Sequence, residues 1–268
     1  MDKKLLILDI DGTLSTSNKE ITPKTRDAIM GLLKRGHKCM LASGRPLPGM
    51  LWAADALNFK TYGGYLLSYN GAKIVRYDTM ETVYEKRLPK EILPTLYDYA
   101  KEHNCGIISY DGDTIISGNG INEYIELESR INGMRIRETD HFFAYFQADV
   151  IKCMLCAHPD QAEVMEQELL ERIADRVSIY RSEPFYVETM PLGVDKAASL
   201  ARVLPQLGLT REDCVACGDG YNDIGLIRYA GVGVAMANAQ QPLKDAADMI
   251  TLSNDEDGLV PVIETFFA

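Results

Sequence analysis

The chain has 268 residues, 46% hydrophobic and 25% charged, which are values of a globular protein with room for one large or two ordinary domains. The formal net charge of −11 argues against nucleic acid as the main partner, because phosphate backbones are bound by basic surfaces. No apolar run approaches the roughly 20 residues of a membrane span, and the start, MDKKLLILDIDG, lacks the features of a signal peptide. We therefore expect a cytoplasmic protein with no membrane partner.

The first segment of the chain predicts a β-α-β unit. Residues 4–10, KLLILDI, form a short continuous apolar run, as in a parallel strand that is buried on both faces. A helix follows, with Thr22 as its N-cap, Pro23 at its first position and Gly36 as its stop. Residues 37–43 are predicted as the next strand, and two strands joined by a crossover helix should be parallel neighbours.

The middle of the chain, residues 82–190, has a different pattern. Two predicted helices, 90–103 and 161–173, are spread among short strand candidates that lack regular crossover helices. The candidates are residues 106–111, 113–118, 148–157, 176–182 and 185–190. This pattern is typical of an antiparallel sheet with helices on one face. We predict that residues 82–190 form an inserted α+β domain, and the alternative is one continuous domain.

The last third of the chain returns to alternating strands and helices. Strands are predicted at 213–219, 232–236 and 249–253, and helices at 195–207, 222–229, 242–247 and 259–267. Such alternation implies a doubly wound α/β sheet. We predict that residues 1–81 and 191–268 together form this first domain.

Unusual polar groups follow three of the predicted strands. They are Asp9 and Asp11 with Gly12 and Thr13 after the first strand, Ser43, Gly44 and Arg45 after the second, and Asp219, Asn222 and Asp223 in the loop 218–223. Because ligands bind beyond the carboxyl ends of parallel strands, we expect these groups to meet at one edge, together with Lys196 at the start of a helix. The acids would repel one another there. Mg²⁺ prefers carboxylate oxygens and accepts phosphate oxygens, so it is the natural counter-ion.

The two aspartates of the first loop suggest phosphoryl transfer. Asp9 can bind the metal with one oxygen and attack phosphorus with the other, since carboxylates are known nucleophiles in this chemistry. Asp11 can lean to the same side, protonate the leaving alkoxide and later take a proton from water. Ser43 and Lys196 can hold the phosphoryl oxygens, and Asp219 can complete the metal site.

Three similar motifs have simpler explanations. The acids of Asp255-Glu-Asp257-Gly258 precede the last predicted helix, where they would serve as N-cap and first-turn partners of the helix dipole. Asp111-Gly-Asp113 is typical of a hairpin turn. Two CxxC pairs, 153–156 and 214–217, lie in apolar strands, on which positions three apart face opposite sides. We therefore expect buried, reduced thiols and no zinc site.

Taken in order, the four motifs resemble those of the haloacid dehalogenase superfamily. They are LLILDIDGTL, LASGRP, GVDKAASL and CGDGYNDIGLI. The stretches SYNGA (68–72), GVGVAMANA (231–239) and TLSNDEDGL (251–259) narrow the resemblance to the Cof-type phosphatases, which carry a large, C2-type cap between the second and third motifs. The fold implied is a doubly wound, Rossmann-like α/β core with an inserted α+β cap. The resemblance covers both core segments.

The resemblance also implies roles for individual residues. Asp9 would be the nucleophile that forms an aspartyl phosphate, and Asp11 the general acid/base whose backbone carbonyl also binds Mg²⁺. Asp219 would supply a further carboxylate ligand, and Asp223 would support the metal and the lysine without binding the ion directly. Asn70 of the NGA loop would face the substrate. Phosphate would be bound by Ser43, Gly44, Lys196 and Asn222.

The function implied is a Mg²⁺-dependent phosphatase of small phosphorylated metabolites, such as sugar phosphates or a phosphorylated cofactor. The cap would select the leaving group, and its polar candidates are Glu123, Arg130, Arg135, Arg137 and Arg181. Two alternatives remain: a phosphomutase or phosphotransferase on the same scaffold, and a non-catalytic sugar-phosphate sensor. A sensor would be expected to lack Asp9 or Asp11, and both are present. The sequence contains no oligomer signal, so a monomer is the default expectation.

Overall fold

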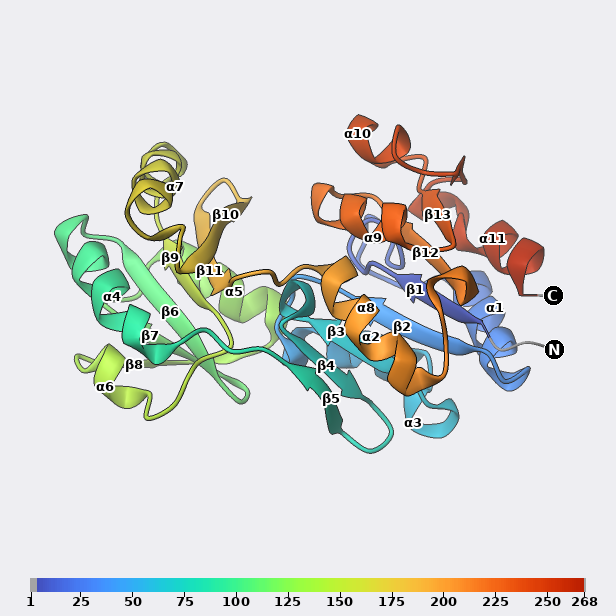
Figure 1. Cartoon of the computed structure of the whole chain (residues 1–268), viewed down its shortest axis with the longest axis horizontal. Helices are drawn as coiled ribbons and strands as arrows, with labels where there is room; N and C mark the ends of the chain where they lie inside the picture. Colours follow the sequence, from blue (N-terminus) through green and yellow to red (C-terminus); the bar gives the residue numbers. More distant parts are fainter. Residues whose placement is uncertain (1–3, 268) are drawn as a thin grey trace. The chain divides into compact units, whose positions relative to one another are not determined.

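The computed structural model describes residues 4–267, and the chain forms two compact units (Figure 1). The first unit runs to Glu85 and resumes at Asp195, and the second comprises Lys86–Val194. The sequence pattern places the boundaries of the inserted unit at 81/82 and 190/191. In the structure they lie at 85/86 and 194/195, four residues further on in each case.

The first unit is built on a sheet with the strand order β14-β13-β12-β1-β2-β3-β4-β5. Its strands are β1 (Leu5–Leu8), β2 (Lys38–Ala42), β3 (Tyr65–Ser68), β4 (Lys73–Arg76), β5 (Glu81–Glu85), β12 (Cys214–Gly218), β13 (Val232–Ala235) and β14 (Met249–Ile250). Strands β14 through β3 pair in parallel, and β4 and β5 are antiparallel to their neighbours. The chain adds strands on both sides of β1, so the sheet is doubly wound as predicted.

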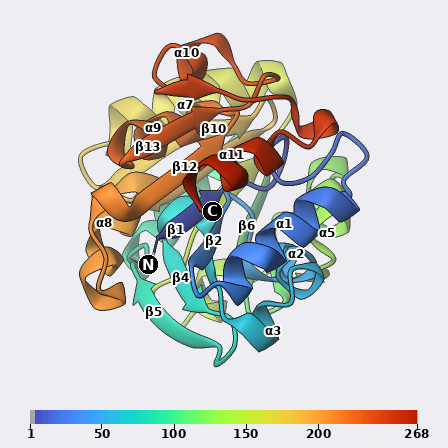
Figure 2. The same cartoon turned by 90° about the vertical axis from the view of Figure 1, so that its right-hand side faces the viewer.

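The helices of the first unit cover both faces of this sheet. They are α1 (Pro23–Lys34), α2 (Leu51–Ala56), α3 (Phe59–Tyr62), α8 (Lys196–Leu207), α9 (Ile224–Tyr229), α10 (Gln241–Lys244) and α11 (Leu259–Phe266). Figure 2 shows α8 and α9 on one side of the strands and α1 and α2 on the other. The four residues of β1 are completely buried, as their apolar run predicts. Throughout residues 4–267, no helix is both long enough and apolar enough to cross a membrane.

The second unit contains a sheet with the order β10-β11-β9-β6-β7-β8. Its strands are β6 (Gly106–Asp111), β7 (Thr114–Gly118), β8 (Arg135–Glu138), β9 (Cys153–Cys156), β10 (Val177–Glu183) and β11 (Tyr186–Pro191). Its helices are α4 (Leu93–Glu102), α5 (Glu123–Asn132), α6 (Phe142–Tyr145) and α7 (Pro159–Ile173). Neighbouring strands are antiparallel except β7 and β8, which are parallel.

The helices of the second unit lie on both faces of its sheet, so the expectation of helices on one face is wrong. Ile107 of β6 belongs to the core shared with α4 and α7. The side chains of a strand alternate between faces, so Gly106 and Tyr110 face the other side. There a Cβ at Gly106 would meet Ile125 of α5 at 2.6 Å, and the Tyr110 hydroxyl donates to Glu128 of α5 at 2.8 Å.

The acids before the last helix also differ from their prediction. Gly258 is the N-cap of α11, without a side-chain cap. Asp255 accepts hydrogen bonds from the backbone N–H and the hydroxyl of Ser17, at 2.8 and 2.7 Å. Asp257 accepts from the hydroxyl of Thr22, the N-cap of α1. The two acids therefore tie the C-terminal loop to the loop between β1 and α1. All six cysteines are buried and free, as expected.

Candidate active site

Three polar residues of the first unit directly follow the carboxyl ends of adjacent strands. Asp219 follows β12, Asp9 follows β1 and Ser43 follows β2. These strands are neighbours, in the order β12-β1-β2, and the winding of the sheet changes direction between β1 and β12. Crevices at such a reversal are where open α/β sheets bind ligands. The fold thus brings residues that are distant in sequence to one edge.

Gly12 lets the loop after β1 pass close to Asp219. Its φ of +81° lies in the left-handed region, and a Cβ there would collide with the Asp219 carboxylate. Thr13 donates from Oγ1 to Asp219 Oδ1 at 2.9 Å. Asn238 donates from Nδ2 to the carbonyl of Gly12 at 2.7 Å. The approach of the two loops therefore depends on the absence of a side chain at position 12.

Lys196 is a buried cation between two carboxylates. It is the first residue of α8, whose N-cap Asp195 accepts from the backbone N–H of Ala198. Its ammonium donates to Asp9 Oδ1 and Asp223 Oδ1, both at 2.6 Å, and the residue is 1% exposed. Burial by itself would lower the pKa of Lys196, but the Asp223 and Asp9 carboxylates outweigh it and raise this pKa. Lys196 is therefore charged at neutral pH.

Asp223 fixes the loop that follows β12. While Oδ1 accepts from Lys196, Oδ2 accepts from the backbone N–H groups of Asp219 and Gly220, at 3.2 and 3.1 Å. The residue has no exposed surface. Both oxygens of this carboxylate are thus engaged by protein donors, and they set the position of Asp219.

Asp9, Asp219 and Asp223 form a compact acidic cluster, because each offers a carboxylate oxygen within 4.8 Å of the others. Burial, together with the neighbouring Asp223 and Asp219, raises the pKa of Asp9 well above its usual value despite Lys196. Burial is also the main cause that raises the pKa of Asp219 to about 6. The Lys196 ammonium contacts Asp9 and Asp223, and the three acids together with this lysine carry a formal charge of −2 when all are ionised. This all-oxygen donor set fits a divalent cation such as Mg²⁺.

The carboxylate of Asp11 is not part of this cluster. Arg45 donates to both of its oxygens, from Nε to Oδ2 at 2.6 Å and from Nη2 to Oδ1 at 2.9 Å. Lys19 donates to Oδ1 at 2.9 Å. Burial would raise the pKa of Asp11, but the hydrogen bonds and charges of Arg45 and then Lys19 prevail and lower it. Both Asp11 oxygens are therefore held by cationic side chains.

Asn70 connects the loops that follow β2 and β12. Its backbone N–H donates to the carbonyl of Ser43 at 3.0 Å, and Asn222 donates from Nδ2 to Asn70 Oδ1 at 3.1 Å. A Cβ at Gly44 would lie only 3.1 Å from the Asn70 amide. Asn70 and the preceding Tyr69 both have positive φ, of 51° and 52°, which is strained for residues other than glycine. Ser43 is buried, and its hydroxyl accepts from the N–H of Arg45.

Four residues at this edge received no role from the sequence: Thr13, Lys19, Arg45 and Asn238. Thr13, Arg45 and Asn238 do lie within quoted motifs, LLILDIDGTL, LASGRP and GVGVAMANA, whereas Lys19 lies in none of them. Lys19 reaches Asp11 because the chain turns back at residues 16–20, where Thr16 and Glu20 are hydrogen bonded. No local pattern predicts that contact, since the two residues are in an irregular loop.

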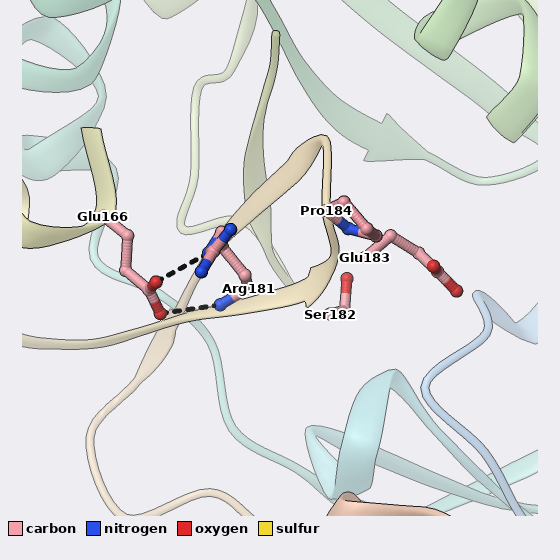
Figure 3. A pocket seen from close by; sticks show the side chains of 5 residues that line it. All are labelled: Glu166, Arg181, Ser182, Glu183 and Pro184. Carbon is pink, nitrogen blue, oxygen red and sulfur yellow. Dashed lines mark hydrogen bonds and ion pairs between the residues drawn. The ribbon is translucent and has the colours of Figure 1, made fainter. Parts of the chain in front are cut away.

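In the second unit, a pocket at the α7–β10 junction is lined by Glu166, Arg181, Ser182, Glu183 and Pro184 (Figure 3). Arg181 donates from its backbone N–H and from Nε to Glu166, at 3.0 and 2.8 Å. Arg135 pairs with the exposed Asp113 at 2.6 Å. Two of the polar cap candidates thus have carboxylate partners within the second unit. Glu123 is the first residue of α5, Arg130 lies in its last turn, and Arg137 lies in β8.

A site of buried acids and one lysine at the edge of a doubly wound sheet defines a class of phosphoryl-transfer proteins, and comparison with known proteins identifies the family. The model of the haloacid dehalogenase-like hydrolases matches residues 6–263, so the chain belongs to this family. The crystal structure of a haloacid dehalogenase-like hydrolase from Bacteroides thetaiotaomicron has a TM-score of 0.94 and is 42% identical, covering 99% of this chain and 100% of that one.

Two curated relatives from Bacillus subtilis are each 30% identical to the chain. YxeH, whose name describes it provisionally as a phosphatase, matches over 97% of both chains. YcsE, named 5-amino-6-(5-phospho-D-ribitylamino)uracil phosphatase, matches over 98% of this chain and 95% of its own. The protein is therefore a phosphatase enzyme of the haloacid dehalogenase superfamily, which confirms the resemblance to the Cof-type branch.

Proposed function

We propose that this enzyme is a Mg²⁺-dependent phosphatase that hydrolyses small phosphorylated metabolites, such as sugar phosphates or phosphorylated cofactors, through an aspartyl phosphate on Asp9. The observation that carries the proposal is the buried Asp9–Lys196–Asp223 arrangement beside Asp219. Its unbalanced negative charge suits a divalent cation, and the relative YcsE is named for a small phosphorylated substrate. The charge supports the metal, and the relative supports this class of substrate.

The metal would be held by the Asp9 and Asp219 carboxylates and the main-chain carbonyl of Asp11. Asp223 would support the site from behind, because protein donors already occupy both of its oxygens. When bound, Mg²⁺ supplies positive charge that balances the carboxylates and the phosphoryl oxygens. Lys196 would provide the remaining positive charge, and Ser43, Gly44 and Asn222 would supply polar contacts to the phosphoryl group.

The reaction has two steps. Asp9 attacks phosphorus with Oδ2, to which no residue of the described part of the chain donates, while Lys196 holds Oδ1. The Asp9–phosphorus bond forms, the bond from phosphorus to the substrate oxygen breaks, and that oxygen takes the proton of the Asp11 carboxyl. Water then attacks phosphorus, gives a proton to Asp11, and releases inorganic phosphate with regeneration of Asp9. Asp11 thus serves as acid first and as base second.

Phosphate release from a panel of sugar phosphates, nucleotides and phosphorylated vitamins tests the proposal, with Mg²⁺ or with a chelator. The parent is compared with Asp9→Asn and with Asp27→Asn, whose side chain is exposed on α1. Release that requires both Mg²⁺ and Asp9, and is unchanged in Asp27→Asn, supports the proposal. Transfer of phosphate between hydroxyls without release would instead make the enzyme a phosphomutase. No reaction in a folded protein that binds Mg²⁺ would contradict both.

A further inference from the structure

Asp11 is held by the protein at both of its oxygens, although the proposed reaction needs this group to move a proton. Arg45 forms a two-pronged contact, with Nε on Oδ2 and Nη2 on Oδ1. Two parallel hydrogen bonds of this kind fix the direction of a carboxylate as well as its place. The contribution of Lys19 is smaller, because its side chain is 63% exposed and its charge is screened by solvent.

Arg45 is suited to act as an anchor because it is itself fixed. Its backbone N–H donates to Ser43 Oγ at 3.2 Å, and its carbonyl accepts from the N–H of Tyr69 at 2.9 Å. Its side chain is largely buried, at 16% exposed. The residue lies just beyond β2, a central strand of the sheet. Asp11 lies in the loop that follows β1, where its backbone forms an isolated bridge with Ser15 and its side chain is held by Arg45 and Lys19.

We propose that Arg45 is a positioning residue for Asp11: its guanidinium holds the Asp11 carboxylate in the place from which it exchanges protons with the leaving group and with water. This inference rests on the proposed function of Asp11. Arg45 acts through Asp11 and is not assigned any contact with the phosphoryl group. A guanidinium has five N–H donors in a fixed plane and no acceptor, so it cannot take part in the proton transfer itself.

The number of hydrogen bonds between Arg45 and Asp11 depends on whether Asp11 carries a proton. When Asp11 is ionised, its two oxygens can accept from Nε and Nη2 at the same time, as in the two-pronged contact described above. When Asp11 carries the proton, one of its oxygens becomes a donor and only the other can keep its bond to Arg45. The guanidinium therefore keeps Asp11 in place through both steps with at least one hydrogen bond.

The experiment compares two substrates that differ in their need for an acid. The leaving group of glucose 6-phosphate is a sugar alkoxide, which needs a proton as it departs. The leaving group of 2,4-dinitrophenyl phosphate is a stable phenolate, which needs none. The value of kcat/KM reports the first step, in which the leaving group departs. Variants are Arg45→Gln, Arg45→Lys, Asp11→Asn and the double Asp11→Asn/Arg45→Gln. The control is Arg76→Gln, which removes an equally two-pronged pair with Asp78, at 2.7 and 2.7 Å, on β4.

We expect Arg45→Gln to lower kcat/KM for glucose 6-phosphate by about 10- to 100-fold, as misplacement of an acid does. For 2,4-dinitrophenyl phosphate, the same substitution should change kcat/KM by less than about threefold. Arg45→Lys should restore only part of the loss, since an ammonium cannot replace a two-pronged contact. Adding Arg45→Gln to Asp11→Asn should cause no further loss, because both changes remove the same function. Arg76→Gln should leave kcat/KM unchanged for both substrates.

Equal losses for both substrates would overturn the proposal, since Arg45 would then bind the phosphoryl group directly. Additive losses in the double variant would overturn it too. A crystal structure of Arg45→Gln provides a test that does not depend on activity: displacement of the Asp11 carboxylate supports the proposal, and an unchanged position refutes it. If the parent hydrolyses neither substrate while Asp11 is displaced in Arg45→Gln, the positioning contact stands and the proposed function fails.

Discussion

Replacing Lys196 with methionine tests the electrostatic account of the site most directly. The side chain is 1% exposed and its ammonium lies 2.6 Å from both Asp9 and Asp223, so methionine preserves most of the volume but removes the cation that both buried carboxylates contact. Removal of one partner from a buried ion pair costs about 3–5 kcal/mol of unfolding free energy. We expect a loss of this size at pH 8 and without metal.

The loss should depend on pH in a definite direction. In Lys196→Met the folded-state pKa of Asp9, which burial already raises in the parent, rises further, so the folded variant binds protons more readily than the folded parent. The extra penalty relative to the parent is absent at pH values where Asp9 is protonated in both folded proteins, and it grows by about 1.4 kcal/mol per pH unit once Asp9 ionises in the parent but not in the variant. The variant should therefore be closer to the parent at pH 5 than at pH 8.

Urea unfolding at the two pH values, with a chelator present, measures both quantities. Lys34→Met, at an exposed position in the last turn of α1, serves as the control and should show no such trend. A second change, Asp223→Asn, removes one of the unpaired acids and should recover part of the stability of Lys196→Met. A loss for Lys196→Met that is the same at pH 5 and pH 8 would refute the reasoning, because the two acids would then not be the origin of the penalty.

Three further outcomes follow from particular contacts. Mg²⁺ must displace the proton of Asp219, whose pKa is about 6. The apparent dissociation constant of Mg²⁺, measured by calorimetry, should therefore rise by up to about tenfold per pH unit below pH 6. A constant affinity from pH 7 to pH 5 would contradict this expectation. Gly12→Ala should abolish most activity by colliding with Asp219, whereas Gly36→Ala, with a similar φ of +90° and open space, should lower only stability, by about 1 kcal/mol. Asp257→Asn weakens the acceptor of the Thr22 hydroxyl and should lower the unfolding free energy, measured by urea unfolding, by about 1 kcal/mol. An unchanged free energy would show that this hydrogen bond does not contribute to stability.

Local patterns in the sequence predicted the parts of the fold that depend on short-range physics. The apolar run of β1 can be stable only as a buried strand, and Thr22, Pro23 and Gly36 mark the limits of α1 by their backbone preferences. Strands joined by crossover helices must be parallel, so residues after β1, β2 and β12 were expected at one edge. The meeting of acids there follows from topology alone.

Other features depend on contacts that no local pattern contains. The sequence predicted no strands at the positions of β3, β4 and β5. These short strands extend the sheet beyond β2, and they are held there by pairing with their neighbours. The acids Asp255 and Asp257 have the pattern of a helix start, yet their partners Ser17 and Thr22 lie 238 and 235 residues away. Long-range donors compete with the local helix end for the same carboxylates, and packing decides which prevails.

The candidate site divides in the same way. The sequence by itself determined which chemical groups are present, because the four motifs carry the acids, the lysine and the hydroxyl, and their order specifies the superfamily. Only the tertiary structure decided how those groups are paired. Lys196 lies between Asp9 and Asp223, whereas Asp11 is held apart from them by Arg45. The reason is physical: the protonation and direction of a buried carboxylate are set by whichever charges lie within a few ångströms, and that distance is fixed by the fold.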